Sequence, residues 1–203
     1  DRAKHLATLY LEDISDFIVE CIDENFGFSR YAERLGRSAN SFDELYAHLQ
    51  NEPTYIDKIT LQILEEKLQE IQPNLVCFSV PFPGNLYSAF RCAQFIKKHY
   101  PKIKIAMGGG FPNTELRSLS DPRVFDFFDF ITLDDGELPL ELLCDHISNS
   151  PPLEGLGVEN SSPSEVLGVA KRTFIIENDK VIYKNNSTKP DYKQSQVGTP
   201  DYS

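Results

Sequence analysis

The feature that most constrains the fold is an alternation of short apolar runs with amphipathic segments between residues 75 and 147. Three runs have the length of strands: Leu75–Val80, Lys102–Met107 and Phe128–Leu133. The segments that follow them carry apolar residues at helical spacing: 86–100, 113–119 and 138–147. Strand and helix in alternation, joined by short loops, indicate parallel strands with right-handed crossovers. We therefore predict an α/β fold with an open parallel sheet flanked by helices, of the flavodoxin-like kind.

The chain divides by pattern into three parts. Residues 1–71 repeat a helical period and predict a helical N-terminal part, and residues 72–150 form the α/β domain. Residues 151–203 predict a linker, then a β-hairpin, then an extended tether. The hairpin is expected at 173–177 and 180–184, because two apolar runs flank a short polar turn there.

The candidate site follows from the predicted topology. Ligands of open parallel sheets bind beyond the carboxyl ends of the strands, in the loops that follow the three runs. A serine there can hydrogen-bond a ligand, and glycines let the backbone approach one closely. The structural alternatives are a hydroxyl bonded to the backbone and a tight strand-to-helix turn. The predicted ligand-binding residues are Ser79, Pro81, Gly84, Asn85, Gly108, Gly109, Gly110, Asn113, Gly136 and Glu137.

Composition excludes several classes of partner. The chain has 20 Lys and Arg against 31 Asp and Glu, a net charge of −11, which disfavours binding to phosphate backbones. No run approaches the roughly 18 apolar residues of a membrane span, and no secretory signal is visible. The four cysteines are widely spaced and are expected to be buried thiols in a reducing cytoplasm. We therefore expect a cytoplasmic protein with no nucleic-acid or membrane partner.

Independent catalysis is not expected from this chain. Asp134, Asp135 and Glu137 could suggest a Mg²⁺ site, but acidic groups also favour a helix N-terminus, which is the simpler interpretation. No nucleophile–base pair and no metal-ligand cluster can be named. We accordingly predict no catalytic residue and no metal ligand.

The order of several short motifs carries a resemblance. Leu75–Val80 contains a serine at its end, Ile105–Met107 leads into three glycines, and an apolar strand follows that holds Asp129. The next loop reads Asp134-Asp135-Gly136-Glu137. In this order the segment from Leu75 to Ile147 resembles the cobalamin-binding domain that precedes many radical S-adenosylmethionine domains, in which this loop usually reads G-E-G-E.

The resemblance implies a cofactor and a partner. The corrin would lie across the strand ends, with its nucleotide tail near Ser79 and Gly108–Gly110. We expect the chain to be part of a longer protein, a radical S-adenosylmethionine enzyme. The [4Fe-4S] cluster and S-adenosylmethionine would belong to a C-terminal domain of the same polypeptide, since this chain has no C-x-x-x-C-x-x-C motif. The D-x-H-x-x-G motif, whose histidine coordinates cobalt in many cobalamin proteins, is also absent; some radical relatives bind cobalamin without it.

Two other functions stay open. The chain could be a degenerate relative that has lost the corrin and acts in substrate binding or domain docking. Bulky side chains would then fill the crevice, and Phe82, Phe111 and Tyr87 are the candidates. It could also be an unrelated flavodoxin-like receiver or nucleotide-binding module, but the Asp134-Asp135 pair follows the wrong strand for a receiver. Fold analogy alone does not decide among these functions.

Overall fold

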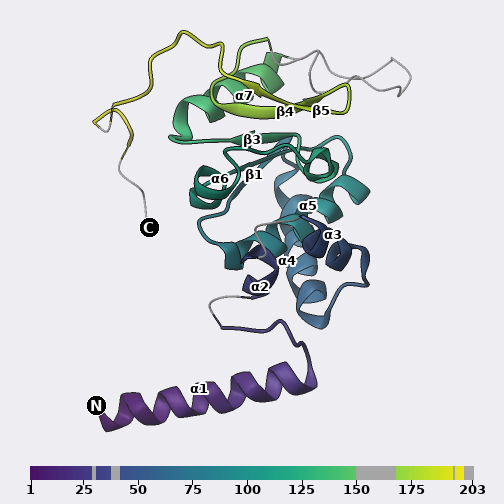
Figure 1. Ribbon diagram of the computed structural model, residues 1–203, viewed down its shortest axis with the longest axis vertical. Coiled ribbons are helices and arrows are strands. Elements are labelled where there is room, and N and C mark those ends of the chain that lie inside the picture. Colours follow the sequence, from purple (N-terminus) through teal and green to yellow (C-terminus); the bar gives the residue numbers. More distant parts are fainter. Residues whose placement is uncertain (29–30, 38–41, 150–167, 194, 199–203) are drawn as a thin grey trace. The chain divides into compact units, whose positions relative to one another are not determined.

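The computed structural model describes residues 1–28, 31–37, 42–149, 168–193 and 195–198 (Figure 1). The chain forms two compact units. We call Asp1–Pro73 with Val80–Pro101 the helical unit, and Asn74–Ser79 with Lys102–Ser203 the sheet unit. Most of the linker predicted after residue 150 lies outside the described residues.

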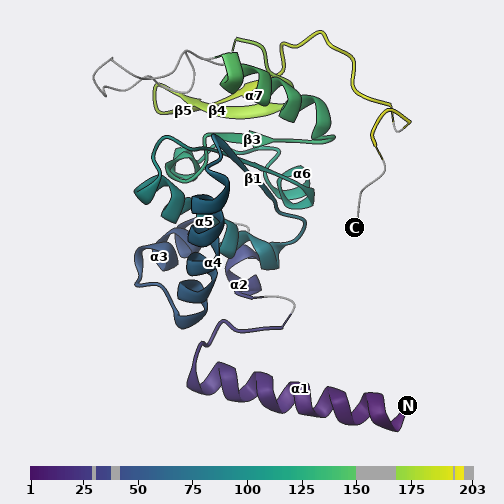
Figure 2. The same cartoon turned by 180° about the vertical axis from the view of Figure 1, so that it is seen from behind.

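The sheet unit contains one five-stranded open sheet of order β1-β2-β3-β4-β5 (Figures 1 and 2). β1 pairs with β2 and β2 with β3 in parallel, whereas β4 and β5 form a hairpin whose first strand pairs antiparallel with β3. The predicted α/β class with an open sheet is confirmed. The strands are β1 Leu75–Ser79, β2 Lys104–Gly108, β3 Phe130–Thr132, β4 Thr173–Glu177 and β5 Lys180–Lys184.

Two α-helices and a 3₁₀ turn complete the sheet unit: α6 Gly110–Glu115, η2 Pro122–Asp126 and α7 Glu137–Asn149. α6 begins earlier than the segment expected around 113–119, directly after Gly109. A buried apolar cluster joins the parallel strands to α7 and to the hairpin. Its members are Ala106, Phe130, Leu143, Ala170 and Ile175.

β1 does not have the environment expected of it. Its apolar run does not alternate, which is typical of a strand buried on both faces, but none of the residues of β1 is buried. β1 stands at the edge of the sheet, where β2 is its neighbour, and Cys77 and Ser79 are exposed. The buried-thiol prediction is likewise wrong for three of the four cysteines. Cys21 at the end of the N-terminal helix, Cys77 on β1 and Cys144 on α7 are exposed, and only Cys92 is buried.

The helical unit is built around α5, whose buried residues form much of its core. Its elements are α1 Arg2–Cys21, α2 Glu33–Arg37, α3 Asp43–Gln50, α4 Tyr55–Ile71, η1 Pro83–Asn85 and α5 Leu86–His99. α2 lies directly on η1: a Cβ at Gly36 would stand 2.4 Å from the carbonyl oxygen of Pro83, so only glycine fits there. None of the described helices is both long and apolar enough to cross a membrane.

α4 and α5 begin in different ways. Thr54 and Asp57 form a capping box at the start of α4, each side chain accepting a hydrogen bond from the other residue's backbone N–H at 3.1 Å. Asn85 is the N-cap residue of α5, but its side chain makes no capping hydrogen bond. The start of α5 is instead preceded by the 3₁₀ turn η1, which contains Pro83.

Candidate functional site

Several predicted residues lie together at the carboxyl ends of β1 and β2, which form one edge of the sheet unit. Ser79 and Gly108 are register partners at the last pair of the parallel β1–β2 ladder. Gly109 follows with φ 105° and ψ −170°, a conformation that residues with a side chain rarely adopt, and α6 starts at Gly110. Ser79 and Gly110 are exposed, so this stretch of strand ends is open to solvent.

Gly108 has a packing role within the sheet. A Cβ on Gly108 would stand 2.8 Å from Oγ1 of Thr132 on β3, inside the normal contact distance. The Thr132 hydroxyl also donates a hydrogen bond to the carbonyl of Met107, at 3.4 Å. The space beside Gly108 is therefore filled by a side chain of the protein.

Asn113 joins α6 to the loop that follows β3. Its Oδ1 accepts a hydrogen bond from the backbone N–H of Asp134, which has a left-handed φ of 58°. Arg117 donates from Nε to the carbonyl of Asn113 at 2.7 Å and forms an ion pair with the Asp134 carboxylate. Beyond Asp134, a Cβ on Gly136 would meet no atom within 4 Å, and Glu137 begins α7 with an exposed side chain.

Arg172, which immediately precedes β4, fastens the same loop. It donates to the carbonyls of Leu133 at 3.3 Å and Asp135 at 2.9 Å, and it pairs with Asp191 at 2.8 Å. The hydrogen bond from Arg172 holds the pKa of the Asp191 carboxyl below its usual value. Sequence reasoning missed Arg117 and Arg172, since no local pattern connects them to residues 17 to 39 positions away.

The structure thus groups Ser79, Gly108–Gly110, Asn113, Gly136 and Glu137 along one edge of the sheet unit. Pro81, Gly84 and Asn85 belong to the helical unit, on and beside η1; Pro81 and Asn85 are exposed and Gly84 is partly buried.

The three bulky residues considered as fillers of the crevice differ in burial and in the unit to which they belong. Phe82 is 69% exposed, Phe111 is buried within the sheet unit, and Tyr87 is buried in the helical unit with its hydroxyl bonded to Asp57.

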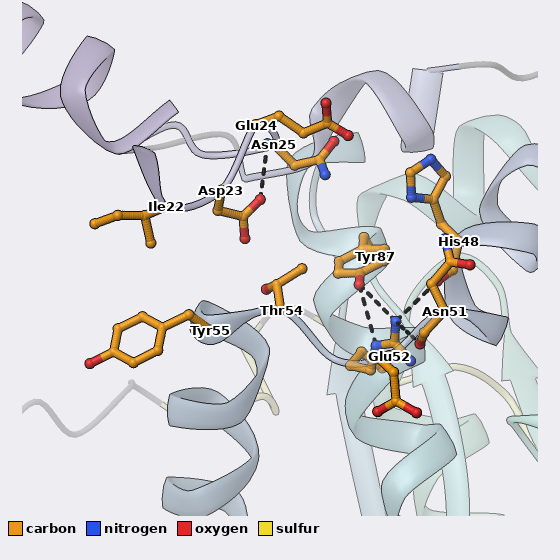
Figure 3. A pocket seen from close by; sticks show the side chains of 11 residues that line it. Ile22, Asp23, Glu24, Asn25, His48, Asn51, Glu52, Thr54, Tyr55 and Tyr87 are labelled. Carbon is orange, nitrogen blue, oxygen red and sulfur yellow. Dashed lines mark hydrogen bonds between the residues drawn. The ribbon is translucent and has the colours of Figure 1, made fainter. Parts of the chain in front are cut away.

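The helical unit holds a separate polar pocket of about 310 Å³ (Figure 3). Figure 3 shows its lining coming from the segment after α1, from the end of α3 and from the start of α4. The lining residues are Ile22, Asp23, Glu24, Asn25, His48, Asn51, Glu52, Thr54, Tyr55, Tyr87 and Arg91.

Much of the pocket's polar lining is bonded within the protein. Asp23 is 6% exposed and accepts hydrogen bonds from the backbone of Asn25 at 3.0 Å and from the hydroxyl of Tyr31 at 2.8 Å. The Tyr31 hydroxyl also lies 3.0 Å from Thr54 Oγ1. Burial raises the pKa of Tyr31 well above its usual value, although the Thr54 hydrogen bond opposes this.

Arg91 at the floor of the pocket is a structural cation. It is 3% exposed, and its Nε lies 3.2 Å from Oδ2 of the equally buried Asp57. Its Nη atoms donate to the carbonyls of His48 at 3.1 Å and Leu49 at 2.9 Å, which belong to the last turn of α3. Arg91 therefore satisfies carbonyls that a helix end leaves unpaired, and its own donors are occupied by the protein.

No metal centre emerges from this geometry. In the part of the chain that the structure describes, no three His, Cys, Asp or Glu side chains are grouped so that they could hold an ion. The Asp134 carboxylate, one of three acidic groups considered for Mg²⁺, is paired with Arg117 and lies 3.9 Å from Arg172.

Comparison with known proteins gave no match: no family model, no curated protein and no solved structure is significantly similar to this chain.

Proposed function

We propose that the sheet unit is a cobalamin-binding-type module of a radical S-adenosylmethionine enzyme, and that a corrinoid binds across the carboxyl ends of β1 and β2. The observation that carries the proposal is the pairing of exposed Ser79 with Gly108 at the strand ends, followed by Gly109 in a conformation that glycine favours. Open α/β sheets bind ligands at this edge.

The residues at this edge fit a large, amide-rich ligand. Ser79 supplies an exposed hydroxyl, and Gly109 and Gly110 leave backbone N–H groups unobstructed by a side chain. A Cβ on Gly136, in the loop after β3, would meet no atom within 4 Å, so this loop also leaves space for the ligand. Gly108 contributes differently from what the resemblance implies, because it accommodates Thr132.

In this proposal the chain binds and orients the cofactor and performs no bond-making step itself. A bound corrinoid would supply methyl-transfer or one-electron chemistry at cobalt. The Asn113–Asp134–Arg117 contacts hold the loop after β3 in place, so that Gly136 and Glu137 bound the site from a fixed position.

The remaining components belong to the parent protein. The [4Fe-4S] cluster and S-adenosylmethionine would be held by a radical S-adenosylmethionine domain of the same polypeptide, in the cytoplasm.

The test is a spectroscopic titration of the chain with hydroxocobalamin and methylcobalamin. We expect saturable binding with a shift toward the base-off spectrum, because a nucleotide tail held near Ser79 would draw the lower base away from cobalt, and no histidine directly follows a strand here to replace it. Ser79→Phe should abolish binding by covering the strand ends. Ser148→Phe is the matched control: Ser148 is also exposed, but it lies near the end of α7, about 16 Å along the helix axis from Glu137.

A docking module without a corrinoid is the second candidate function. The observation that favours it is that the space at Gly108 is filled by Thr132 and that Asp134 is already paired with Arg117. Absence of binding at high micromolar cobalamin, with a folded chain, would support this candidate and overturn the first.

A further inference from the structure

α1 presents an apolar stripe that the rest of the described chain does not cover. None of its residues is buried. Tyr10, Ile14 and Phe17 are 70%, 47% and 60% exposed, far more than such side chains are in a packed helix. An isolated 20-residue helix is only marginally stable in water, because most helical stability in proteins comes from packing of the apolar face.

The stripe has the spacing of a coiled-coil seam. It runs through Ala3, Ala7, Tyr10, Ile14, Phe17 and Cys21, which are separated alternately by four and three residues. This 3.5-residue period keeps one seam facing a neighbouring helix along the whole length, about 30 Å for 20 residues.

The charges of α1 are ordered against its dipole. Arg2 and Lys4 lie in the first turn, whereas Glu12, Asp13, Asp16 and Glu20 lie in the second half, with no acidic residue in the first turn and no basic residue in the last. A helix dipole favours the opposite order. The ordering therefore disfavours α1 alone, but it complements a second copy of α1 that runs in the opposite direction.

We propose that α1 forms an antiparallel pair with α1 of a second copy of this chain. In the register where facing residue numbers sum to 24, Ala7 faces Phe17, Tyr10 faces Ile14 and Ala3 faces Cys21. The small Ala7 thus lies opposite the large Phe17, a small–large pairing that favours close packing. The antiparallel arrangement sets the basic first turn of each α1 beside the acidic second half of the other, and it sets the two helix dipoles antiparallel.

Other occupants fit the stripe less well. A lipid surface favours helices whose polar face is rich in Lys and Arg, whereas the polar face of α1 is mainly acidic. The exposed face of α4 formed by Tyr55, Ile59 and Ile63 is a second apolar surface in the helical unit. Docking of α1 onto α4 would give no role to the charge order of α1.

The first test is the oligomeric state of the full chain by sedimentation equilibrium. We expect a dimer at tens of micromolar, and Ile14→Glu with Phe17→Glu should give a monomer of unchanged secondary structure elsewhere. The matched control is Ile59→Glu with Ile63→Glu on α4, which should remain dimeric. A monomeric wild-type chain at 100 µM, or a dimer lost through the α4 control, would overturn the proposal.

Charge reversal tests the partner's identity. Arg2→Glu with Lys4→Glu should weaken the dimer by roughly tenfold, since acidic ends then face acidic ends. Adding Asp16→Lys and Glu20→Lys should restore the dimer, because both partners carry the reversal. Failure of the fourfold variant to dimerise, while circular dichroism shows α1 intact, would contradict self-pairing.

Crosslinking tests the direction. Cys21 is an exposed thiol on the seam, and Cys77→Ser with Cys144→Ser removes the other exposed ones. In that background, Ala3→Cys should give oxidised dimers joined between position 3 of one chain and Cys21 of the other. Dimers joined only between like positions would show a parallel pair and refute the antiparallel register.

Discussion

Arg91 connects three helices of the helical unit, α3, α4 and α5. It lies buried between the carboxylate of Asp57 and the last carbonyls of α3, and the Tyr87 hydroxyl accepts hydrogen bonds from it at 3.3 and 3.0 Å. A buried ion pair adds little net stability over an apolar pair, but loss of one partner leaves an uncompensated charge. Loss of Arg91 would therefore leave the Asp57 carboxylate buried without its cation and the last carbonyls of α3 without a donor.

Replacement of this cation should be severe. Arg91→Met is expected to lower the free energy of unfolding by about 3–5 kcal/mol, because Asp57 stays buried without its partner. Urea unfolding of the chain measures this. The control Lys67→Met, which breaks an exposed pair with Glu70, should cost no more than about 1 kcal/mol. Equal effects of the two variants would contradict the structural role given to Arg91.

Tyr87 makes the stability of the helical unit fall at alkaline pH. Burial raises the pKa of Tyr87 from its ordinary value of 10.0 to about 12, and its hydrogen bond to Asp57 acts in the same direction. The folded chain thus keeps the phenolic proton that the unfolded chain releases. The contribution of the Tyr87 phenol to the free energy of unfolding is therefore fully present below pH 10 and is lost as the pH rises toward 12.

Tyr87→Phe should accordingly flatten the fall in unfolding free energy between pH 10 and pH 12, measured by urea denaturation. Part of the fall in unfolding free energy should remain, because two other groups contribute to it. Burial raises the pKa of Cys92 to about 11, and it also raises the pKa of Tyr31. Tyr183→Phe, at a 45% exposed tyrosine of β5, serves as the control. An unchanged slope in Tyr87→Phe would argue against burial of a neutral phenol.

Gly108 makes a third prediction at the residue scale. Gly108→Ala should destabilise the sheet unit by about 1–3 kcal/mol, since the new Cβ would press on Thr132. Combining it with Thr132→Ala should recover part of the loss, because Oγ1 is removed. Thermal unfolding of both variants, with Gly136→Ala as a neutral control in open space, measures this. Additive losses in the double variant would rule out the contact.

These residue-scale contacts mark the limit of what the sequence predicts. The glycine run after β2 and the serine at the end of β1 are local signals, and their positions follow from the predicted strands. The partners of Arg91 on α3 stand 42 and 43 positions away in the chain, so no local pattern reveals them. The contact of Gly108 with Thr132 likewise depends on a strand pairing that only the folded sheet provides.

At the scale of elements, the predictions that were confirmed are those that rest on the conformational preferences of neighbouring residues. The hairpin was predicted at 173–177 and 180–184, and β4 and β5 have these bounds, because Asn178 and Asp179 adopt the left-handed turn that their side chains favour. α6 begins before the expected segment because Pro112 lies in its first turn, where the missing N–H has no partner to lose. That the hairpin extends the parallel sheet is a tertiary fact without a local signal.

The hairpin is part of the sheet unit's core. Ile175 on β4 is fully buried in the cluster that includes Phe130 and Leu143. Ile175→Ala should lower the free energy of unfolding by about 2–5 kcal/mol, by loss of apolar contacts and creation of a cavity. Val169→Ala, at a 53% exposed residue just before β4, should change it by less than about 0.5 kcal/mol. Should Ile175→Ala be as mild as its control, the hairpin would be an appendage.

At the scale of the whole molecule, the chain is interleaved. The contacts divide it so that Val80–Pro101 joins the N-terminal helices, while β1, which directly precedes that segment, belongs to the sheet unit. The pattern-based division into 1–71, 72–150 and 151–203 follows sequence order. The compact units do not, because each of them is made of two separate stretches of the chain. Three of the predicted ligand-binding residues, Pro81, Gly84 and Asn85, fall on the helical side of this division.

The proposed function requires a corrinoid to lie across the carboxyl ends of β1 and β2. Amide hydrogen exchange of the chain, with and without saturating hydroxocobalamin, tests it most directly because it locates the ligand. We predict protection concentrated at Ser79, Gly109–Asn113 and the loop 134–137, with the amides around Arg91 unchanged. Protection at the polar pocket of the helical unit, or no protection at any amide under saturating cobalamin, would contradict the claim.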